Sequence, residues 1–326
     1  MSFSANMRIF GGMDEHAYAL TRIAPTPSGY LHRGNAFSFA ITALFAAKTG
    51  ARLALRIDDL DRERYRPEYL ADIFKQLDWL GIEPDLGPSS PDDFARNFSQ
   101  HQKLDAYRSA VQQLDEMNLL YACSCSRKEF SARQNLHCNC LTSQRHLSDE
   151  NVLRLNDLPE KHVLTDLGGS RYEMNLAVNP GPIPILQKKQ LPSYQIASIV
   201  DDLEMGVDLI IRGSDLLPSS GLQQHIAQKL SATRYGEVAH FHHRLIYDGN
   251  GKMSKSAGAS SLLHFSSSGG TVSDFYIWLC EAIGVGAANL PDFTAGKAWL
   301  KHLRAATELN ELMNHVKHPG IETKKP

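Results

Sequence analysis

The sequence, 326 residues long, has no long apolar run and no marked excess of charge of either sign. No apolar run reaches the roughly 18 residues of a membrane helix, and no charged-then-apolar segment opens the chain. These absences argue against a membrane span and against secretion, so we expect a cytoplasmic protein with no membrane partner. The formal net charge is -2, so any contact with nucleic acid must come from local patches and should be modest and salt-sensitive. Nor does the sequence show an internal repeat, a low-complexity segment or a catalytic triad.

Cysteine is scarce, yet four of the five cysteines fall within residues 123–140. In a chain expected to stay in a reducing compartment, such crowding indicates a metal site rather than disulfide bonds. Two close pairs of thiolates fit tetrahedral Zn²⁺ in a structural role, because four protein ligands leave no open position. The predicted ligands are Cys123, Cys125, Cys138 and Cys140. His137 and His146 are alternative ligands, reduced buried thiols are the alternative to a metal, and Cys280 lies in an apolar helical run typical of a core.

Strand-like and helix-like segments alternate along most of the chain, which predicts an α/β fold with a parallel sheet and crossover helices. The expected strands cover residues 19–24, 52–57, 209–212 and 241–247. The expected helices cover residues 36–48, 67–80, 98–117, 193–203 and 220–230. Two or three more are expected after residue 271, over 272–283 and 294–316. Residues 121–190 differ in texture, with much Cys, Asn, Gly and Pro and short strand-like runs, and we interpret them as an insertion.

This alternation divides the chain into five parts. We expect a loose leader (1–18), the first half of a nucleotide-binding fold (19–120), an inserted zinc-binding subdomain (121–190), the second half of the fold (191–262) and a small helical region (263–326). Ligands of such sheets bind beyond the carboxyl ends of the strands, where residues 22–34 and 58–61 would lie.

Residues 248–256 (DGNGKMSKS) form a Gly-rich stretch that carries two lysines and two serines. Lys252 and Lys255 supply positive charge, and Ser254 and Ser256 supply hydroxyl donors. The glycines permit close approach of the backbone to a triphosphate. Taken alone, the stretch fits either a phosphate-binding loop or a solvated surface loop.

A second candidate phosphate site follows the first expected strand. Residues 22–36 (RIAPTPSGYLHRGNA) run from a buried strand through a turn rich in Pro and Gly into an Ala-rich helix. His32, Gly34 and Asn35 thus fall at a helix N-terminus, where free N–H groups and the helix dipole attract anions. A capping or packing role is the alternative for His32.

Four motifs in this order resemble those of the class I aminoacyl-tRNA synthetases, and within them the glutamyl/glutaminyl branch. They are residues 32–35 (HRGN), which resemble the HIGH element, residues 252–256, which match the KMSKS element, and residues 56–61 (RIDDLD) and 209–216 (LIIRGSDL). The resemblance covers about four fifths of the chain. It implies a Rossmann-type catalytic domain, followed by a helical region similar to the stem-contact region of the branch.

The resemblance implies activation of an amino acid by ATP with Mg²⁺. A carboxylate is already ionised at pH 7, so no general base is required, and catalysis consists of positioning and of stabilising phosphate charge. The residues implied in catalysis are His32, Gly34, Lys252 and Lys255. The residues implied in ATP binding are Thr26, His32, Gly34, Asn35, Lys252, Ser254 and Lys255.

Glutamate carries two carboxylates and one ammonium group, so its pocket requires two fixed cations and one carboxylate. Arginine suits the first task because its planar fork meets a carboxylate at two points. The residues implied for glutamate are Arg22, Ala24, Thr26, Asp58, Tyr194 and Arg212. The alternatives are a buried helix aromatic for Tyr194 and a surface ion pair for Arg56 and Asp61.

Two positions near the site depart from the pattern of the branch. Asp58 stands where glutamate-specific members usually carry Glu and glutamine-specific members often carry Asp, so glutamine is an alternative substrate. Arg33 stands where a small apolar residue normally packs. Cys138 is not the usual type of zinc ligand.

About 70 residues follow Ser256, enough for a small helical bundle but not for an additional anticodon-binding domain. The chain therefore resembles the short members of the branch, which attach glutamate to the modified base queuosine in the anticodon loop of tRNA(Asp). Such single-stranded loop bases are the usual targets of specific RNA recognition. We expect a monomer. The alternatives are a truncated glutamyl- or glutaminyl-tRNA synthetase-like ligase with another acceptor, and a non-catalytic regulator that binds nucleotide or tRNA.

Overall fold

The computed structural model describes residues 18–125, 129, 139–141, 151–179, 183–248, 251–252, 261–286, 290 and 293–317. The expected leader therefore lies outside the described residues, apart from Tyr18. Among the described residues, no helix is long and apolar enough to cross a membrane.

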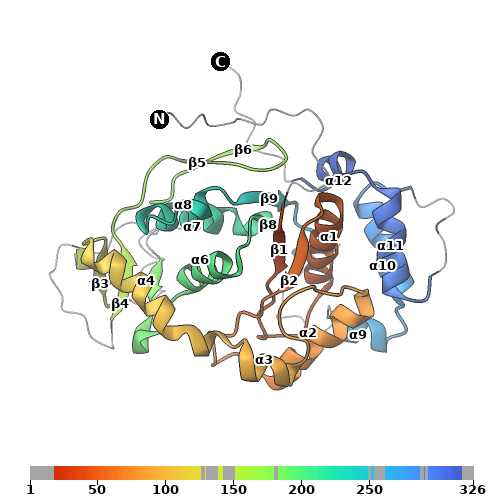
Figure 1. The fold of residues 1–326 in the computed structure, drawn as a ribbon, viewed down its shortest axis with the longest axis horizontal. Coiled ribbons are helices and arrows are strands. Elements are labelled where there is room, and N and C mark those ends of the chain that lie inside the picture. The colour runs from red at the N-terminus through yellow and green to blue at the C-terminus, as the bar shows by residue number, and fades with distance from the viewer. Residues whose placement is uncertain are drawn as a thin grey trace, which may run out of the picture.

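A four-stranded parallel sheet forms the centre of the protein (Figure 1). In spatial order its strands are β2 (Arg52–Leu55), β1 (Leu20–Ile23), β8 (Leu209–Gly213) and β9 (Ala239–His243). The strands are buried along nearly their whole length, as expected where helices cover both faces of a sheet. From β1 the chain proceeds to β2 on one side, and β8 lies on the other side. The strand order thus reverses between β1 and β8, which is where such sheets bind ligands.

Helix α1 (Arg33–Thr49) packs against the sheet and is buried over most of its surface. It begins after His32, whose Nδ1 accepts a hydrogen bond from the Asn35 N–H (3.3 Å), while Asn35 Oδ1 accepts one from the His32 N–H (3.1 Å). This reciprocal cap fixes the first turn. The helix ends at Gly50, whose φ of 72° is the left-handed conformation that favours glycine.

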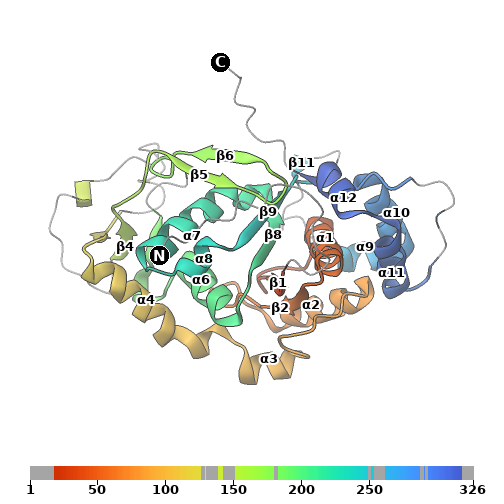
Figure 2. The same cartoon turned by 45° about the horizontal axis from the view of Figure 1, so that its top comes forward.

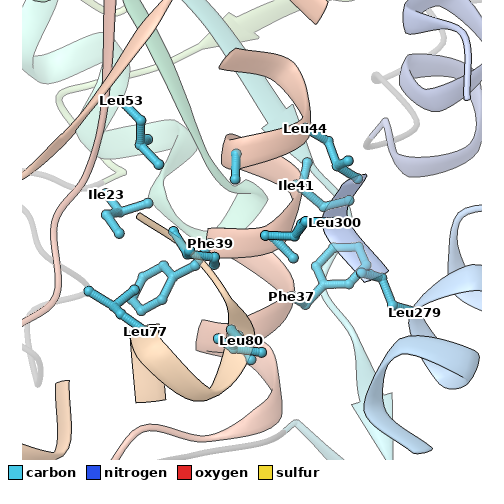
Figure 3. Close-up of a cluster of buried hydrophobic side chains, with 14 of the residues drawn as sticks. Ile23, Phe37, Phe39, Ile41, Leu44, Leu53, Leu77, Leu80, Leu279 and Leu300 are labelled. Carbon is cyan, nitrogen blue, oxygen red and sulfur yellow. The ribbon is translucent and has the colours of Figure 1, made fainter. Parts of the chain in front are cut away.

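Helices from distant parts of the chain share one apolar core with α1. They are α2 (Pro67–Leu80), α10 (Val272–Ala282) and α11 (Gly296–Ala306). Figure 3 shows the core, with side chains labelled from the sheet and these helices: Ile23, Phe37, Phe39, Ile41, Leu44, Leu53, Leu77, Leu80, Leu279 and Leu300. Each fully buried side chain of this size contributes about 1.5–3 kcal/mol, so the cluster holds the C-terminal helices firmly against α1.

The opposite face of the sheet is covered by four helices, α4 (Leu104–Glu116), α6 (Tyr194–Met205), α7 (Leu217–Lys229) and α8 (Thr233–Gly236). Neighbouring residues of a strand point into different cores, as Ile211 and Ile210 do in β8. The result is a three-layer arrangement in which α6 lies beside the sheet (Figure 1).

Antiparallel strands stand between the two halves of the parallel sheet in sequence. They are β3 (Leu120–Cys123), β4 (Val152–Leu155), β5 (His162–Thr165), β6 (Arg171–Met174) and β7 (Pro184–Leu186). β3, β4 and β7 form one sheet, and β5 and β6 form a hairpin. In the hairpin turn, the Leu167 N–H donates to the His240 carbonyl of β9 (2.7 Å). The hairpin therefore lies beside β9, the strand at one edge of the parallel sheet (Figure 2). This contact covers part of an edge strand.

Shorter elements complete the described chain: α3 (Pro91–Asn97), η1 (Gln100–Lys103), η2 (Asn139–Leu141), η3 (Lys188–Gln190), η4 (Ser214–Leu216), β10 (Tyr247–Asp248), β11 (Gly251–Lys252), α9 (Leu262–Ser267) and α12 (Leu309–Val316). Helix α3 was not predicted, although Ser90, as N-cap, and Pro91, at the first position, are its start signals. The other expected strands and helices are confirmed to within a few residues, with the following exceptions.

Three expected elements differ from the structure. The expected helix 294–316 is two helices, α11 and α12, because the backbone of Thr307 between them is extended. The expected helix 98–117 begins with η1, and its α-helical part starts only at Leu104. The expected strand 241–247 leaves the sheet after β9, because the Arg244 N–H donates to the Val316 carbonyl (2.7 Å) instead.

A tight turn before α6 holds Lys189 (φ 59°) and Gln190 (φ 57°) in the left-handed conformation, which costs an L-residue about 1–2 kcal/mol. Across the turn, the Gln187 N–H donates to the Leu191 carbonyl (2.7 Å). We expect Lys189→Gly to raise the free energy of unfolding by about 0.5–1 kcal/mol, measured from the midpoint of urea denaturation. Lys188→Gly, whose backbone has no positive φ, should bring no gain, and an equal gain in both variants would contradict the prediction.

Candidate active site

A cavity of about 320 Å³ opens at the carboxyl ends of β1 and β8, where the strand order reverses. Its walls also include the loop after β1 and the first turns of α1 and α6. The predicted site residues that line it are Arg22, Ala24, Thr26, His32, Gly34, Asn35, Tyr194 and Arg212. The structure thus brings together residues that lie far apart in the sequence. It does not bring Asp58 into this lining.

The wall formed by the start of α1 is suited to an anion. The N-terminus of this 17-residue helix presents N–H groups and the positive end of the helix dipole. At Gly34 a Cβ would crowd the His32 ring, at 3.0 Å from its Cε1 and 3.1 Å from its Nδ1, so the absence of a side chain leaves this ring its place. Since Nδ1 of His32 accepts the Asn35 N–H, the ring proton of the neutral form is on Nε2, which is then a donor.

The predicted phosphate loop is joined to this same wall at its downstream end. Ser261 forms an antiparallel bridge with His32, and the Leu262 N–H donates to the Leu31 carbonyl (2.8 Å). Upstream, the backbone of Lys252 belongs to β11. Three further residues predicted in this loop lie outside the described residues: Ser254, Lys255 and Ser256. Residues that follow the predicted loop in sequence therefore contact His32, the start of the other phosphate-binding candidate.

Arg33, the unexpected residue of the first motif, joins α1 to the C-terminal helices. Its guanidinium lies 4.4 Å from the ring centre of Phe265 in α9 and 6.0 Å from that of Trp278 in α10. Contacts of this kind contribute about 0.5–1 kcal/mol at exposed sites. Arg33 therefore packs through its charged head where a small apolar residue was expected.

Arg212, near the carboxyl end of β8, is a buried cation with open hydrogen-bonding positions. Its side chain is 4% exposed and its Nη2 donates to Gln223 Oε1 (2.9 Å). Its Nε and Nη1 are buried and have no hydrogen-bond partner among the described residues. Buried charges are normally paired, and unsatisfied buried donors cost free energy. An anionic group in the cavity would satisfy them.

Arg22, near the end of β1, is already paired. Its Nε donates to Oδ1 of Asp202 (2.9 Å) and its Nη2 to Oδ2 (3.4 Å). Oδ1 of Asp202 also accepts from Nη1 of Arg56 (2.8 Å). Burial acts to raise the pKa of Asp202, but the two guanidiniums overcome this and hold the pKa below its usual value. Asp202 is therefore a fully buried carboxylate that stays charged between two arginines.

Asp58 lies beside this network rather than in the cavity. Arg56 donates from Nε to Asp58 Oδ1 (2.7 Å) and from Nη2 to Oδ2 (3.1 Å), and Gln100 donates to Oδ1 (3.4 Å). Burial raises the pKa of Asp58, while Arg56 opposes that rise. The alternative of a surface pair between Arg56 and Asp61 is wrong, because Arg56 is buried and Asp61 pairs with Arg64 (2.6 Å).

Tyr194 and His243 border the cavity from α6 and β9. Tyr194 is 37% exposed, so the alternative of a buried helix aromatic is wrong. His243 was not predicted: it is the last residue of β9, but it lies in the middle of the expected strand 241–247. Its Nδ1 donates to the Arg244 carbonyl (3.0 Å), which leaves Nε2 to accept from the Ser38 hydroxyl (3.0 Å). Burial lowers the pKa of His243, so the ring is neutral at pH 7.

Three predicted zinc ligands gather where β3 ends and η2 lies: Cys123, Cys125 and Cys140. Their sulfurs lie within 4.8 Å of one another, and Sγ of Cys125 is 3.8 Å from Sγ of Cys140. Two zinc–sulfur bonds of about 2.3 Å at a tetrahedral angle place the sulfurs about 3.8 Å apart, so this donor set fits Zn²⁺. The remaining candidates lie outside the described residues: Cys138, His137 and His146. Cys280 is fully buried in α10, which confirms its assignment to the core.

A parallel sheet with a cavity at the reversal of strand order, bordered by a helix N-terminus and buried arginines, is the arrangement of the Rossmann-type α/β fold. The family model described as tRNA synthetases class I (E and Q), catalytic domain, matches residues 19–317, and the chain belongs to this family. The resemblance and the fold class inferred from the four motifs are thereby confirmed.

Curated relatives share about a third of the aligned residues. Glutamate-tRNA ligase 2 of Acidiphilium cryptum is 34% identical over an alignment of 268 residues, and the match covers 75% of this chain and 56% of that protein. Glutamyl-Q tRNA(Asp) synthetase of Pseudomonas fluorescens is 32% identical over 219 residues, 67% of this chain and 70% of that protein. The chain thus spans about half the length of glutamate-tRNA ligases that it matches.

Solved structures show the same fold. The crystal structure of a glutamate tRNA ligase from Elizabethkingia meningosepticum, in complex with its amino acid, matches with a TM-score of 0.66 at 21% identity. The match covers 93% of this chain and 66% of that one. At this identity the likeness shows the fold alone.

Proposed function

We propose that the protein activates glutamate with ATP, forming glutamyl-adenylate and pyrophosphate. The observation that carries the proposal is the pair of open donors on Arg212, buried in a cavity whose other wall is the start of α1. A buried arginine favours a carboxylate, and a helix N-terminus favours phosphate. The names of the relatives, glutamate-tRNA ligases and a glutamyl-Q tRNA(Asp) synthetase, support glutamate as the amino acid.

In this proposal the two sides of the cavity take different substrates. Arg22 and Arg212 bind the carboxylates of glutamate, with Tyr194, Ala24 and Thr26 around them. The start of α1 binds ATP, and His32 donates from Nε2 to a phosphate oxygen. The other residues proposed for ATP are Gly34, Asn35, Lys252, Ser254 and Lys255. Asp58 keeps a role in substrate binding only if it exchanges Arg56 for the ammonium group.

The reaction needs positioning rather than proton transfer. The glutamate carboxylate attacks the α-phosphate, the bond from that phosphorus to the bridging oxygen breaks, and pyrophosphate leaves with the electron pair. Mg²⁺ bound with ATP neutralises phosphate charge. The lysines of the loop and the start of α1 stabilise the remaining charge, and His243 is neutral and adds none.

We further propose that the acceptor is queuosine in the anticodon loop of tRNA(Asp). The relative named glutamyl-Q tRNA(Asp) synthetase supports this choice, because the match covers 70% of its length. Glutamate-tRNA ligases match equally well, so transfer to another tRNA acceptor is the second candidate. A regulator that only binds nucleotide or tRNA would not need paired arginines and a phosphate loop in one site.

Exchange of labelled pyrophosphate into ATP, without tRNA, tests the activation step. We expect exchange with glutamate and much less with glutamine or aspartate, because a neutral or shorter side chain leaves a buried arginine unpaired. Absence of exchange with all three amino acids would rule out activation in the absence of tRNA. Repeating the assay with tRNA present would then separate a tRNA-dependent ligase from a regulator.

Transfer of labelled glutamate tests the acceptor. We expect labelling of tRNA(Asp) that carries queuosine, and none of tRNA(Asp) that lacks the modified base. Labelling of tRNA(Glu), released by mild alkali as a 3′ ester, would favour the second candidate instead. Removal of the 3′-terminal nucleotides distinguishes the two, since it leaves the anticodon base intact.

The proposed zinc site predicts metal loss in one cysteine variant. Cys140→Ser removes one thiolate of the cluster, and we expect the zinc content to fall from about one atom per chain to near zero, because structural zinc requires four ligands. Mass spectrometry of the purified protein measures the metal. Cys280→Ala changes a buried cysteine far from the cluster in the fold and should leave the zinc content unchanged. Full zinc in Cys140→Ser would contradict the site.

The remaining features of the organisation are also proposals. Residues 121–190 would form the zinc-binding insertion between the two halves of the nucleotide-binding fold, and residues 263–326 the stem-contact-like region. The monomeric state and the cytoplasmic location stay predictions. Sedimentation of the purified chain tests the first of them.

A further inference from the structure

We propose that Asp202 is a positioning residue of this site: it fixes the Arg22 guanidinium towards the cavity and thereby sets the affinity for glutamate. The inference rests on the proposed function. Asp202 does not line the cavity, so it acts through Arg22 and not by contact with substrate. None of the four sequence motifs contains Asp202.

The contact between Arg22 and Asp202 fixes the orientation of the Arg22 guanidinium. Arg22 meets Asp202 at two points, through Nε and Nη2, and so the plane of the guanidinium cannot rotate freely. Its Nη1 makes no hydrogen bond to a described residue. Because Arg22 lines the cavity while its Nε and Nη2 face Asp202, the remaining donors are those available to a ligand carboxylate.

Asp202 is itself held from a second side. Oδ1 accepts from Arg56 Nη1 (2.8 Å), and Nη2 of Arg56 also donates to the Ser198 hydroxyl (3.0 Å). The Asp202 side chain is 0% exposed, so water does not compete for these hydrogen bonds. The carboxylate is thus fixed between β1, the segment after β2, and α6.

One face of α6 serves the whole arrangement. Tyr194, Ser198 and Asp202 stand four residues apart, a spacing that places them on the same side of a helix. Tyr194 reaches the cavity, Ser198 holds Arg56, and Asp202 holds Arg22. A single helix face therefore sets the aromatic wall and one of the two cations of the glutamate pocket.

The two cavity arginines differ in charge balance. Arg22 forms an ion pair with Asp202, which also pairs with Arg56, whereas among the described residues the Arg212 guanidinium donates only to the neutral Gln223. Arg212 is accordingly the stronger attractor of a carboxylate, and Arg22 is the one whose direction is set in advance. A fixed donor loses little freedom when the ligand binds, which raises affinity.

Asp202→Asn keeps the shape of the side chain and removes the charge and one of the acceptors. In glutamate-dependent pyrophosphate exchange we expect the KM for glutamate to rise about ten-fold or more, with a smaller fall in kcat and an unchanged KM for ATP. Asp201→Asn is the matched control, since Asp201 is equally buried but contacts Gln100, Lys103 and Tyr107 rather than Arg22. Its KM for glutamate should change less than three-fold.

Two further variants separate positioning from general damage. In Arg22→Gln, adding Asp202→Asn should raise the KM no further, because the carboxylate acts through the lost guanidinium. Asp202→Glu keeps the charge but moves it by one methylene group, and it too should raise the KM for glutamate. It provides the test if Asp202→Asn fails to fold. An unchanged KM in whichever of these Asp202 variants folds, or an equal rise in Asp201→Asn, would overturn the inference. A wild-type protein that shows no glutamate-dependent exchange, either without or with tRNA, would overturn the proposed function, and this inference with it.

Discussion

Replacing Arg212 by Met should lower kcat/KM for glutamate-dependent pyrophosphate exchange by about 100-fold or more. Arg212 is 4% exposed, and two of its three guanidinium nitrogens, Nε and Nη1, have no hydrogen-bond partner among the described residues. Losing one member of a buried charge pair costs about 2–5 kcal/mol, and each 1.4 kcal/mol corresponds to a factor of ten. Met has a similar length and no charge, so the cavity keeps its walls and loses only the cation.

The loss should appear mainly in the KM for glutamate if Arg212 binds the ground state and the transition state alike, and in kcat if it tightens only during reaction. Arg154→Met provides the control, because Arg154 is an equally buried arginine on β4, outside the cavity. Its exchange should stay within three-fold of wild type. Activity of Arg212→Met near that of the control would show that glutamate binds elsewhere.

The sequence motifs located the cavity because its residues follow strand ends and a helix start. Arg22 and Arg212 lie near the carboxyl ends of neighbouring parallel strands, so both side chains line the same cavity. His32 and Gly34 are set by the cap of α1, which is a local structure. Local and strand-end features of this kind are readable in one sequence.

The hydrogen-bond and ion-pair partners of these residues could not be predicted from the sequence. Asp58 was predicted for the ammonium group, but Arg56, two residues earlier, occupies both of its oxygens. Asp202 gave no signal, because an acidic residue in a helix is normally an exposed one, and only the packing of α6 against β1 buries it. His243 was missed because the sequence does not show which end-of-strand side chain turns inward. Such pairings depend on the tertiary fold and not on spacing.

The fold, like the site, could be predicted from the sequence only in part. The buried strands and the capped helices were predicted because their hydrophobic patterns and end signals are local. The place where residues 294–316 divide into α11 and α12 was not, because the extended backbone of Thr307, a buried residue, depends on the tertiary fold. Residue propensity at that point favours neither outcome strongly.

Arg56→Met should lower the free energy of unfolding by about 3–5 kcal/mol, the usual cost of breaking a buried ion pair from one side. Arg56 is 6% exposed and meets Asp58 at two points, Asp202 at one and the Ser198 hydroxyl at another. Although burial disfavours its charge, Asp58 and Asp202 raise its pKa well above the usual value, so Arg56 is charged at every accessible pH. The midpoint of urea denaturation measures the loss.

The loss in Arg56→Met should shrink as the pH falls. Burial already raises the pKa of Asp58, and without Arg56 that pKa rises further above its unfolded value of about 3.9. A carboxyl with a raised pKa binds its proton more tightly in the folded state, so its penalty is full above the folded pKa and vanishes below the unfolded one. Stability at pH 5 should therefore be closer to wild type than stability at pH 8. Adding Asp58→Asn should restore part of the stability and remove this pH dependence, because a buried amide does not ionise. Equal losses at both pH values in the single variant would mean that Asp58 finds another partner.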